Sequence, residues 1–336
     1  MPAAVSGVKR YLVIVPILLL FLTPGCGNKT ATFDETIAVS LGSTNSVSGA
    51  PAIIALEKGF FADEGLTVDL QLSSDSPAVM ENLASGDIDT AIVVEVTLVS
   101  AAFADDTLRI VATTSISDND AMVIARRSSG INKPEDIKNK KVGAIAENST
   151  HYYLYLFMLK NGMTINDIDL YFSQPDELID MLASGRLDAV SLFGTYLPLA
   201  RKALDGDAIL FSNPGLYRKI FSLISTESYI TGNSIAIERM LAAIIKAEEY
   251  ISAFPEESMK TTADHLGLEL AEVQEVWEHY DFRVALDQSL LMAYETEAQW
   301  MIRIGWRNQD ELPDFYSLFY FETLSELDKN RVTVIH

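Results

Sequence analysis

The phrase LASGDIDTAIV at residues 83–93 returns as LASGRLDAVSL at residues 182–192. Both copies follow a segment with helical periodicity and lead into a run of apolar residues that is typical of a buried strand. Gly86 and Gly185 occupy the position that ends a helix, where a left-handed backbone costs glycine little. The repetition therefore predicts that one helix-to-strand corner is built twice, once in each of two similar α/β units.

The segment around the first copy alternates between the periodicities of strands and helices. Strands are predicted at residues 36–42, 67–73 and 88–94, and helices at residues 52–65 and 76–85. Ser76 is the candidate N-cap of the second helix, and Pro77 lies in its first turn. This β-α-β-α-β order is the signature of parallel strands joined by right-handed crossovers.

The second half of the chain repeats this order. Strands are predicted at residues 141–147, 167–173 and 187–193, and helices at residues 148–162 and 176–185. Open α/β sheets bind ligands at the carboxyl edge of their strands, and two such edges that face each other make a cleft. The predicted fold class is therefore α/β, with two lobes that each hold a mainly parallel sheet flanked by helices, and with a ligand cleft between the lobes.

The first 25 residues have the composition of an export signal. Lys9 and Arg10 precede a twelve-residue apolar run at residues 11–22, and Thr-Pro-Gly-Cys-Gly follows it. That run is too short to cross a bilayer, which needs about 20 residues. We expect residues 1–25 to be removed, residues 26–35 to form a tether, and Cys26 to carry a lipid anchor. The alternative is an ordinary secreted protein that makes no use of Cys26.

The chain is strongly acidic. Its formal net charge of −22 becomes −24 once Lys9 and Arg10 leave with the signal segment. An acidic surface repels nucleic acid and anionic membrane surfaces, so neither is expected as a partner. Cys26 is the only cysteine, so no internal disulfide can form and the exported fold must depend on its core.

Five phrases carry a family resemblance that spans about residues 36–335. They are GAPAIIALEKGFFADEGLTVDL (49–70), GDIDTAIVVE (86–95), SDNDAMVIARRSSGINKPEDIKNKKVGAI (117–145), GRLDAVSLFGTY (185–196) and YDFRVALDQSLL (280–291). They resemble solute-binding proteins of ABC importers, in the branch that handles nitrate, sulfonates, taurine and pyrimidine precursors of thiamine. The resemblance implies a monomeric periplasmic-binding fold that closes on a small molecule and docks on a membrane permease with its ATPase.

The same resemblance implies how the chain is divided and where it works. The first lobe would hold residues 36–120 and 222–336, and the second lobe residues 121–221, with crossings near residues 117–123 and 214–223. The protein would stay in the periplasm or on the outer face of the cytoplasmic membrane, lipid-anchored at Cys26. A ligand-sensing subunit of a membrane receptor remains an open alternative.

Candidate ligand-binding residues lie in loops that end predicted strands or begin predicted helices. The small-residue loop before Pro51 offers free backbone N–H groups, which can hold an anion or a carbonyl oxygen. Glu95 directly follows a buried strand, where a carboxylate either contacts the ligand or pairs with an arginine. The full set is Asn45, Ser48, Gly49, Glu95, Thr97, Asp118, Asp120, Ser149, Thr150, Tyr152, Thr195 and Tyr196. The alternative is that these loops only cap helices.

The charges of these loops favour a neutral or cationic ligand. Four acids and no lysine or arginine occur in them: Glu95, Asp118, Asp120 and Glu147. Carboxylates accept N–H groups, and Tyr152 or Tyr196 offers an aromatic face, so a pyrimidine-like or amine-bearing compound is the hypothesis. A sulfonate, nitrate or taurine is the alternative, should Arg126, Arg127 or Arg283 fold into the cleft.

No metal, cofactor or catalytic site is predicted. The four histidines, His151, His265, His279 and His336, lack the spacing of a zinc site. The sequence also lacks the GxSxG, CxxC and P-loop patterns. We therefore expect a binding protein without cofactors rather than an enzyme.

Overall fold

The computed structural model describes residues 1–3, 36–194, 196–309 and 311–335. The predicted signal segment beyond residue 3, the tether and Cys26 lie outside the described residues. Within the described ranges, no helix is both long and apolar enough to cross a membrane.

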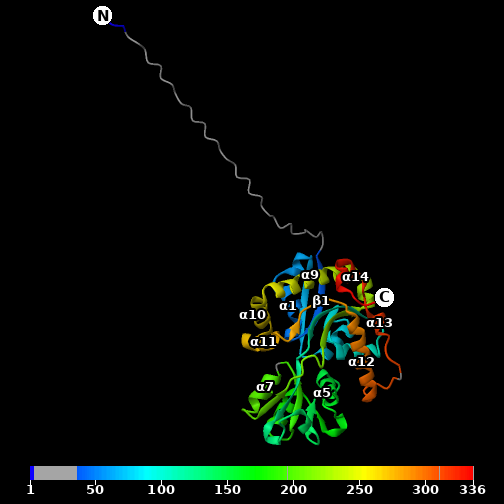
Figure 1. Ribbon diagram of the computed structural model, residues 1–336. Helices are drawn as coiled ribbons and strands as arrows, with labels where there is room; N and C mark the ends of the chain where they lie inside the picture. The colour runs from blue at the N-terminus through cyan, green and yellow to red at the C-terminus, as the bar shows by residue number, and fades with distance from the viewer. Residues whose placement is uncertain (4–35, 195, 310, 336) are drawn as a thin grey trace. The chain divides into compact units, whose positions relative to one another are not determined.

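Two sheets organise the described part of the chain (Figure 1). The six-stranded sheet has the order β11-β4-β10-β3-β1-β2, and the five-stranded sheet has the order β7-β6-β8-β5-β9. The first sheet contains β1 (Ile37–Thr44), β2 (Leu66–Ser73), β3 (Thr90–Val94), β4 (Leu108–Ser117), β10 (Lys219–Thr226) and β11 (Tyr280–Asp281). The second contains β5 (Ala121–Arg126), β6 (Lys141–Ala144), β7 (Asp169–Phe172), β8 (Ala189–Phe193) and β9 (Ala208–Phe211). We call each sheet with its helices the first and the second lobe.

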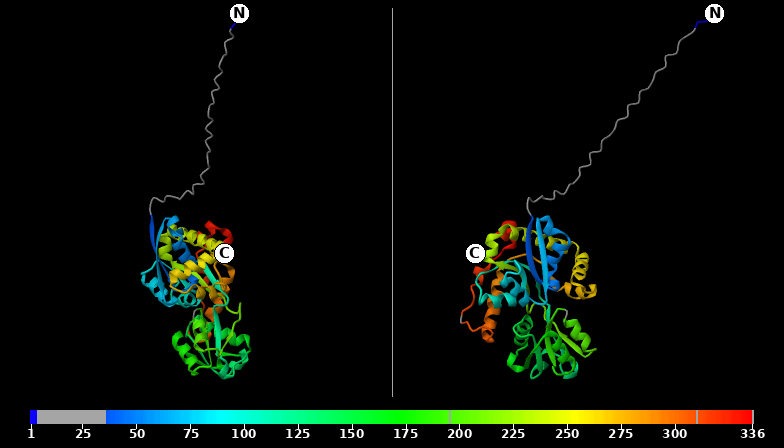
Figure 2. Two further views of the ribbon diagram at one scale, coloured as in Figure 1. Left: turned by 90° about the vertical axis from the view of Figure 1, so that its left-hand side faces the viewer. Right: turned by 180° about the vertical axis from the view of Figure 1, so that it is seen from behind.

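Helices cover both sheets, and the C-terminal helices pack on the first lobe. The first lobe holds α1 (Ala50–Glu57), α2 (Phe60–Asp63), α3 (Ser76–Ser85), α4 (Glu95–Ala102), α8 (Glu227–Gly232), α9 (Ser234–Ala253), α10 (Pro255–Leu266), α11 (Leu270–Trp277), α12 (Gln288–Arg303), α13 (Phe315–Leu318) and α14 (Glu322–Leu327). The second lobe holds α5 (Ser149–Lys160), α6 (Pro175–Ala183) and α7 (Tyr196–Ala203). Figures 1 and 2 show α5 and α7 grouped apart from α1, α9 and α14.

The two sheets share one strand plan, which confirms the predicted α/β fold with two lobes. In the first lobe β1 runs parallel to β2 and β3, and in the second β6 runs parallel to β7 and β8. A strand that arrives from the other lobe then pairs antiparallel with the repeated strand: β10 with β3, and β5 with β8. Each sheet is therefore mixed rather than mainly parallel.

The repeated phrase has the same structural role in both lobes. Gly86 and Gly185 adopt φ values of 80° and 77°, as the corner requires. The Asp89 carboxylate accepts hydrogen bonds from the backbone N and the Oγ of Ser40, both at 2.7 Å. The Asp188 carboxylate likewise accepts from the backbone N of Lys141 at 3.0 Å. Each aspartate thus fastens its strand to the start of the neighbouring parallel strand.

Three details of the predicted helices need correction. The predicted helix at residues 52–65 is interrupted at Gly59, whose φ of 77° separates α1 from α2. Asp75, not Ser76, caps α3, because its side chain accepts a hydrogen bond from the backbone N of Ala78. The predicted helix at residues 148–162 had Ser149 or Thr150 as its candidate cap, but the cap of α5 is Asn148, whose Oδ1 accepts a hydrogen bond from the backbone N of Thr150.

The chain passes between the lobes at two short segments. The first crossing, residues 118–120, joins β4 to β5, and the return crossing, residues 212–218, joins β9 to β10. Because β10 begins at Lys219, the predicted lobe boundary at residue 221 falls inside this strand. The lobes also meet where Trp300 of α12 packs against Tyr152 of α5, with ring centroids 4.8 Å apart.

Candidate functional site

A cleft of about 850 Å³ is lined by residues of both lobes. The first lobe contributes the end of β1, the segment before α3, the start of α4, and the aromatic rings of Phe221 and Tyr280. The second lobe contributes the start of α5 and the segment between β8 and α7. Several helices therefore begin at the cleft, where the positive ends of their dipoles and free N–H groups favour ligand oxygen atoms.

The structure brings five of the predicted site residues into this cleft. They are Asn45, Thr97, Asp120, Ser149 and Tyr196. Six others lie elsewhere: Ser48, Gly49, Glu95, Asp118, Thr150 and Tyr152. Thr195 lies outside the described residues. The predicted loops are thus the right segments, but only some of their side chains face the cleft.

Local hydrogen bonds explain why several polar residues turn away. Ser48 is fully buried, and its Oγ lies 2.7 Å from Ser46 Oγ. Thr150 is also fully buried, and its Oγ1 accepts a hydrogen bond from the backbone N of Ile145. Asp118 is exposed and lines a different hollow, beside Arg218 and Asp281. Ser48 and Thr150 therefore support the loops, whereas Asp118 belongs to the other hollow.

Glu95 lies beneath the cleft, where it holds the return crossing to the first lobe. Its Oε1 accepts a hydrogen bond from the Tyr217 hydroxyl, and its Oε2 accepts one from the backbone N of Ile220 at 2.6 Å. Only 1% of Glu95 is exposed. Burial raises its pKa to about 7, although these two hydrogen bonds act to lower it. Glu95 therefore positions the backbone around Lys219.

A second buried acid, Glu297 of α12, lies close enough to Glu95 to affect its charge. Burial raises the pKa of Glu297 well above its ordinary value, and the negative charge of Glu95 raises it further. The Oε1 atom of Glu297 has no hydrogen-bond partner among the described residues. If both buried carboxyl groups were ionised, their negative charges would repel each other. The pair therefore favours a state in which one of the two carboxyl groups keeps its proton.

The expectation of a cleft without lysine or arginine was wrong, because Lys219 lines it. The Lys219 Nζ lies 2.6 Å from Asp120 Oδ2, and the two side chains are only 7% and 2% exposed. The same Nζ lies 4.1 Å from the centroid of the Phe193 ring. Asp120 also accepts a hydrogen bond from the Tyr280 hydroxyl at 3.1 Å. The first crossing and the start of β10 are thus joined by a buried ion pair.

Aromatic residues of both lobes surround this ion pair, and most of them were absent from the predicted set. Phe193 and Tyr196 come from the second lobe, and Phe221 and Tyr280 from the first. The rings of Phe193 and Tyr196 are 5.5 Å apart and perpendicular. Lys219 had a usable signal, since Arg218 and Lys219 place two cations at the start of an apolar strand within the predicted return crossing. Tyr280 is supplied by a distant segment, so local sequence gave no sign of it.

The described residues offer no group of three or more histidine, cysteine, aspartate or glutamate side chains that could hold a metal ion. What they offer is a cleft with N–H donors, hydroxyl groups, an internally neutralised ion pair and four aromatic rings. That set can bind a small molecule.

The fold and the cleft define a protein of the periplasmic-binding class. Residues 47–258 match the family described as NMT1/THI5 like, and the chain belongs to that family. A Brucella abortus (strain 2308) protein with a binding-protein name is 28% identical over 224 residues, which cover 66% of this chain and 69% of that protein. The formylaminopyrimidine-binding protein of Halalkalibacterium halodurans is 26% identical over 285 residues, which cover 80% of this chain and 84% of that protein.

A solved structure shows the same fold. The periplasmic aliphatic sulphonate binding protein SsuA from Escherichia coli superposes with a TM-score of 0.74 at 16% identity. The match covers 84% of this chain and 92% of that one. At this level of identity the likeness establishes the architecture of the two lobes.

Proposed function

We propose that the protein is an extracytoplasmic solute-binding protein of an ABC importer. It captures a small, planar, pyrimidine-like molecule by lobe closure and delivers it to a membrane permease. One observation carries the choice of ligand: the rings of Phe193 and Tyr196 and those of Phe221 and Tyr280 line one cleft from opposite lobes. A planar heterocycle between such rings gains stacking contacts, while hydroxyl and N–H groups satisfy its ring nitrogens.

The charges of the cleft agree with an uncharged ligand. Asp120 and Lys219 neutralise each other, and Asp75 at the cleft is committed to capping α3. Glu95, the main reason to expect an amine, lies below the surface with both oxygens accepting hydrogen bonds from the protein. An amine would therefore find little free carboxylate, and the pyrimidine-like alternative is the stronger one.

Anion binding of the sulfonate, nitrate or taurine type is the second candidate. The helix starts around the cleft and the presence of Lys219 favour it. Arg126, Arg127 and Arg283 do not line the cleft, so the predicted source of positive charge is not used. An anion that replaced Asp120 as the partner of Lys219 would leave Asp120 buried without a charged partner, at a cost of several kcal/mol.

Calorimetry with 4-aminopyrimidine, methanesulfonate, taurine and nitrate tests the proposal. We expect 4-aminopyrimidine to bind, and Phe221→Leu to weaken it about tenfold by removing one stacking face. Phe103→Leu is the control, because Phe103 lies outside the cleft. At a hundredfold excess over its dissociation constant the ligand should stabilise the protein by about 2.7 kcal/mol. Tight binding of an anion with no binding of the pyrimidine would contradict the proposal, as would turnover of the ligand.

The proposed place of work is the periplasm or the outer face of the cytoplasmic membrane, with a lipid on Cys26. The basic start, the short apolar run and the lone cysteine after Gly25 support it. Mass spectrometry of the wild type and Cys26→Ser tests it. The same unlipidated N-terminus in both would contradict the anchor. Co-purification with a permease rather than a receptor kinase separates transport from sensing.

A further inference from the structure

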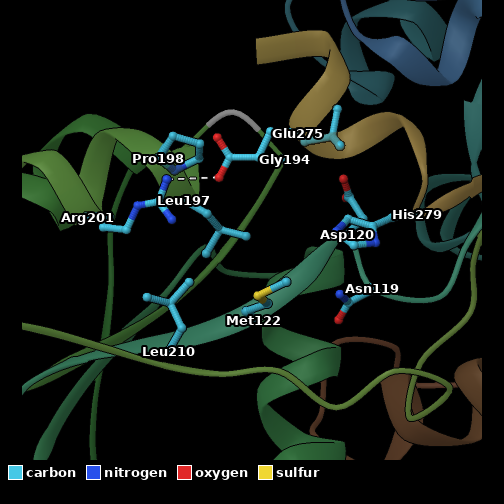
Figure 3. A pocket seen from close by; sticks show the side chains of 11 residues that line it. Asn119, Asp120, Met122, Gly194, Leu197, Pro198, Arg201, Leu210, Glu275 and His279 are labelled. Carbon is cyan, nitrogen blue, oxygen red and sulfur yellow. Dashed lines mark hydrogen bonds and ion pairs between the residues drawn. The ribbon is translucent and has the colours of Figure 1, made fainter. Parts of the chain in front are cut away.

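A second hollow lies beside the cleft and shares three wall residues with it: Asp120, Gly194 and Val276. We call it the side pocket. Its volume is about 440 Å³, including space open to solvent. Figure 3 shows the side chains that line it. Its apolar wall comes mainly from the second lobe: Met122 of β5, Leu210 of β9, and Leu197 and Pro198 of α7.

The wall between the cleft and the side pocket has no side chain at Gly194. A Cβ atom added there would find one neighbour within 4 Å among the described residues, Asp120 Oδ1 at 3.5 Å. The backbone of Gly194 has a φ of 50°, which disfavours residues with side chains. A group attached to a ligand in the cleft would therefore meet no side chain of residue 194 itself at the shared wall.

Two charged side chains of the side pocket are largely exposed to solvent. Arg201 of α7 and Glu275 of α11 form an ion pair between the lobes, with Nη2 and Oε1 3.0 Å apart (Figure 3). Their side chains are 54% and 46% exposed, whereas Leu197 is only 7% exposed. Asn119, Asp120 and His279 also line the pocket, and the carboxylate of Asp120 is already paired with Lys219. A polar substituent placed against the apolar side chains of the wall would lose its water without replacement.

We propose that the side pocket is a subsite for an apolar substituent, a short alkyl chain or small ring, carried by the molecule bound in the cleft. The inference rests on the proposed function, because the substituent needs a head group bound in the cleft. The subsite makes the preferred ligand a substituted heterocycle rather than a bare one. It also ties substituent recognition to lobe closure, since α7 and α11 belong to different lobes.

Calorimetry with matched pairs of probes tests the subsite separately from the head group. The pairs are 4-(methylamino)pyrimidine with 4-(butylamino)pyrimidine, and methanesulfonate with butanesulfonate. Each methylene buried in an apolar site strengthens binding about fourfold. We therefore expect the butyl member of the binding pair to bind at least tenfold more tightly than the methyl member.

Adjacent substitutions in β9 provide a matched control. Leu210→Phe places a larger side chain in the side pocket, while Ile209→Phe adds the same group at a neighbour that does not line it. We expect Leu210→Phe to remove most of the gain from the butyl chain and to leave binding of the methyl member within about twofold. Ile209→Phe should preserve the gain. Equal affinities within the binding pair, or an equal effect of both substitutions, would overturn the subsite.

Failure of both head groups would contradict the proposed function without deciding on the subsite. Crystals under xenon pressure then test the apolar pocket directly. Xenon density between Met122, Leu197 and Leu210 supports the subsite, and its absence at that position contradicts it.

Discussion

The equivalent strands β3 and β8 end in different ways at the cleft. β3 is followed by Glu95, whose carboxylate accepts a hydrogen bond from the backbone N of Ile220 in the arriving strand β10. β8 is followed by Gly194, whose backbone N donates to the carbonyl oxygen of Asp120, just before the arriving strand β5. In the first lobe a buried side chain makes the hydrogen bond at this junction, and in the second lobe both partners of the hydrogen bond are backbone atoms.

The difference shows where a repeated fold is free to diverge. At the other end of the same strands, Asp89 and Asp188 make equivalent hydrogen bonds, because both lobes need this corner to hold parallel strands together. At the cleft, Glu95 fixes the return crossing beneath the surface, whereas Gly194 leaves space beside it. Equivalent hydrogen bonds at one edge of the two sheets support the fold, and different residues at the other edge shape the ligand site.

The largest effect is expected at the first crossing, from Asp120→Ala. This change leaves Lys219, which is 6% exposed, without its carboxylate partner. Breaking a buried ion pair in this way costs about 3–5 kcal/mol of the free energy of unfolding. Denaturant unfolding measures it. The double variant Asp120→Ala with Lys219→Met should recover much of the loss, and a loss below about 1 kcal/mol in the single variant would show that the pair does not hold the crossing.

A smaller, pH-dependent effect is expected where Glu95 and Glu297 meet. The pKa of Glu95 is raised to about 7 by burial, so the folded state binds more protons than the unfolded state between pH 4.5 and 7. The free energy of unfolding should therefore be highest below pH 4.5 for this group and fall as the pH rises towards 7. Glu297→Gln replaces a buried carboxyl group, whose pKa burial raises well above its ordinary value, by a neutral group of similar shape that does not titrate. Because the unfolded wild type gains free energy by ionising this carboxyl group as the pH rises, we expect the variant to be stabilised relative to the wild type at pH 8 and little changed at pH 4.5.

Glu295→Gln is the control for this comparison, because Glu295 is exposed on the same helix. Its difference from the wild type should stay within about 0.5 kcal/mol at both pH values. Equal stability differences for Glu297→Gln at pH 4.5 and pH 8 would show that the two carboxyl groups do not titrate together.

The smallest effects are expected at the two repeated corners. Asp89→Ala removes two hydrogen bonds to Ser40, whereas Asp188→Ala removes one to Lys141. We expect losses of about 2 and 1 kcal/mol, respectively, in denaturant unfolding. Asp87→Ala, at an exposed position in the first copy, should cost less than about 0.5 kcal/mol. A larger loss at Asp188 than at Asp89 would contradict the hydrogen-bonding role of these corners.

Local periodicity was sufficient to predict most of the fold. The repeated phrases and the alternation of strands and helices along the chain follow from patterns that lie within about 20 residues of one another. The two crossings between the lobes were inferred from the family resemblance instead. The antiparallel pairs did not follow, because β10 and β5 reach their partners from the other lobe. Hydrophobic runs identify such strands as buried but do not reveal their direction.

The site was harder to predict because side-chain direction depends on distant partners. The loops at Asn45, Thr97 and Ser149 were expected at the cleft, and their position follows from parallel strand order. Glu95 turns inward because Tyr217 and the backbone N of Ile220 provide its donors. Those donors lie more than 120 residues further along the chain. No pattern in the sequence around Glu95 predicts hydrogen bonds to such distant residues.

A crystal structure of the complex with the tightest-binding probe is the most direct test of the central claim, that a small planar molecule is held between the lobes. We expect the molecule to lie between the rings of Phe193 and Tyr196 on one side and those of Phe221 and Tyr280 on the other, chemically unchanged. A probe bound on another surface, or converted to a product, would contradict the claim.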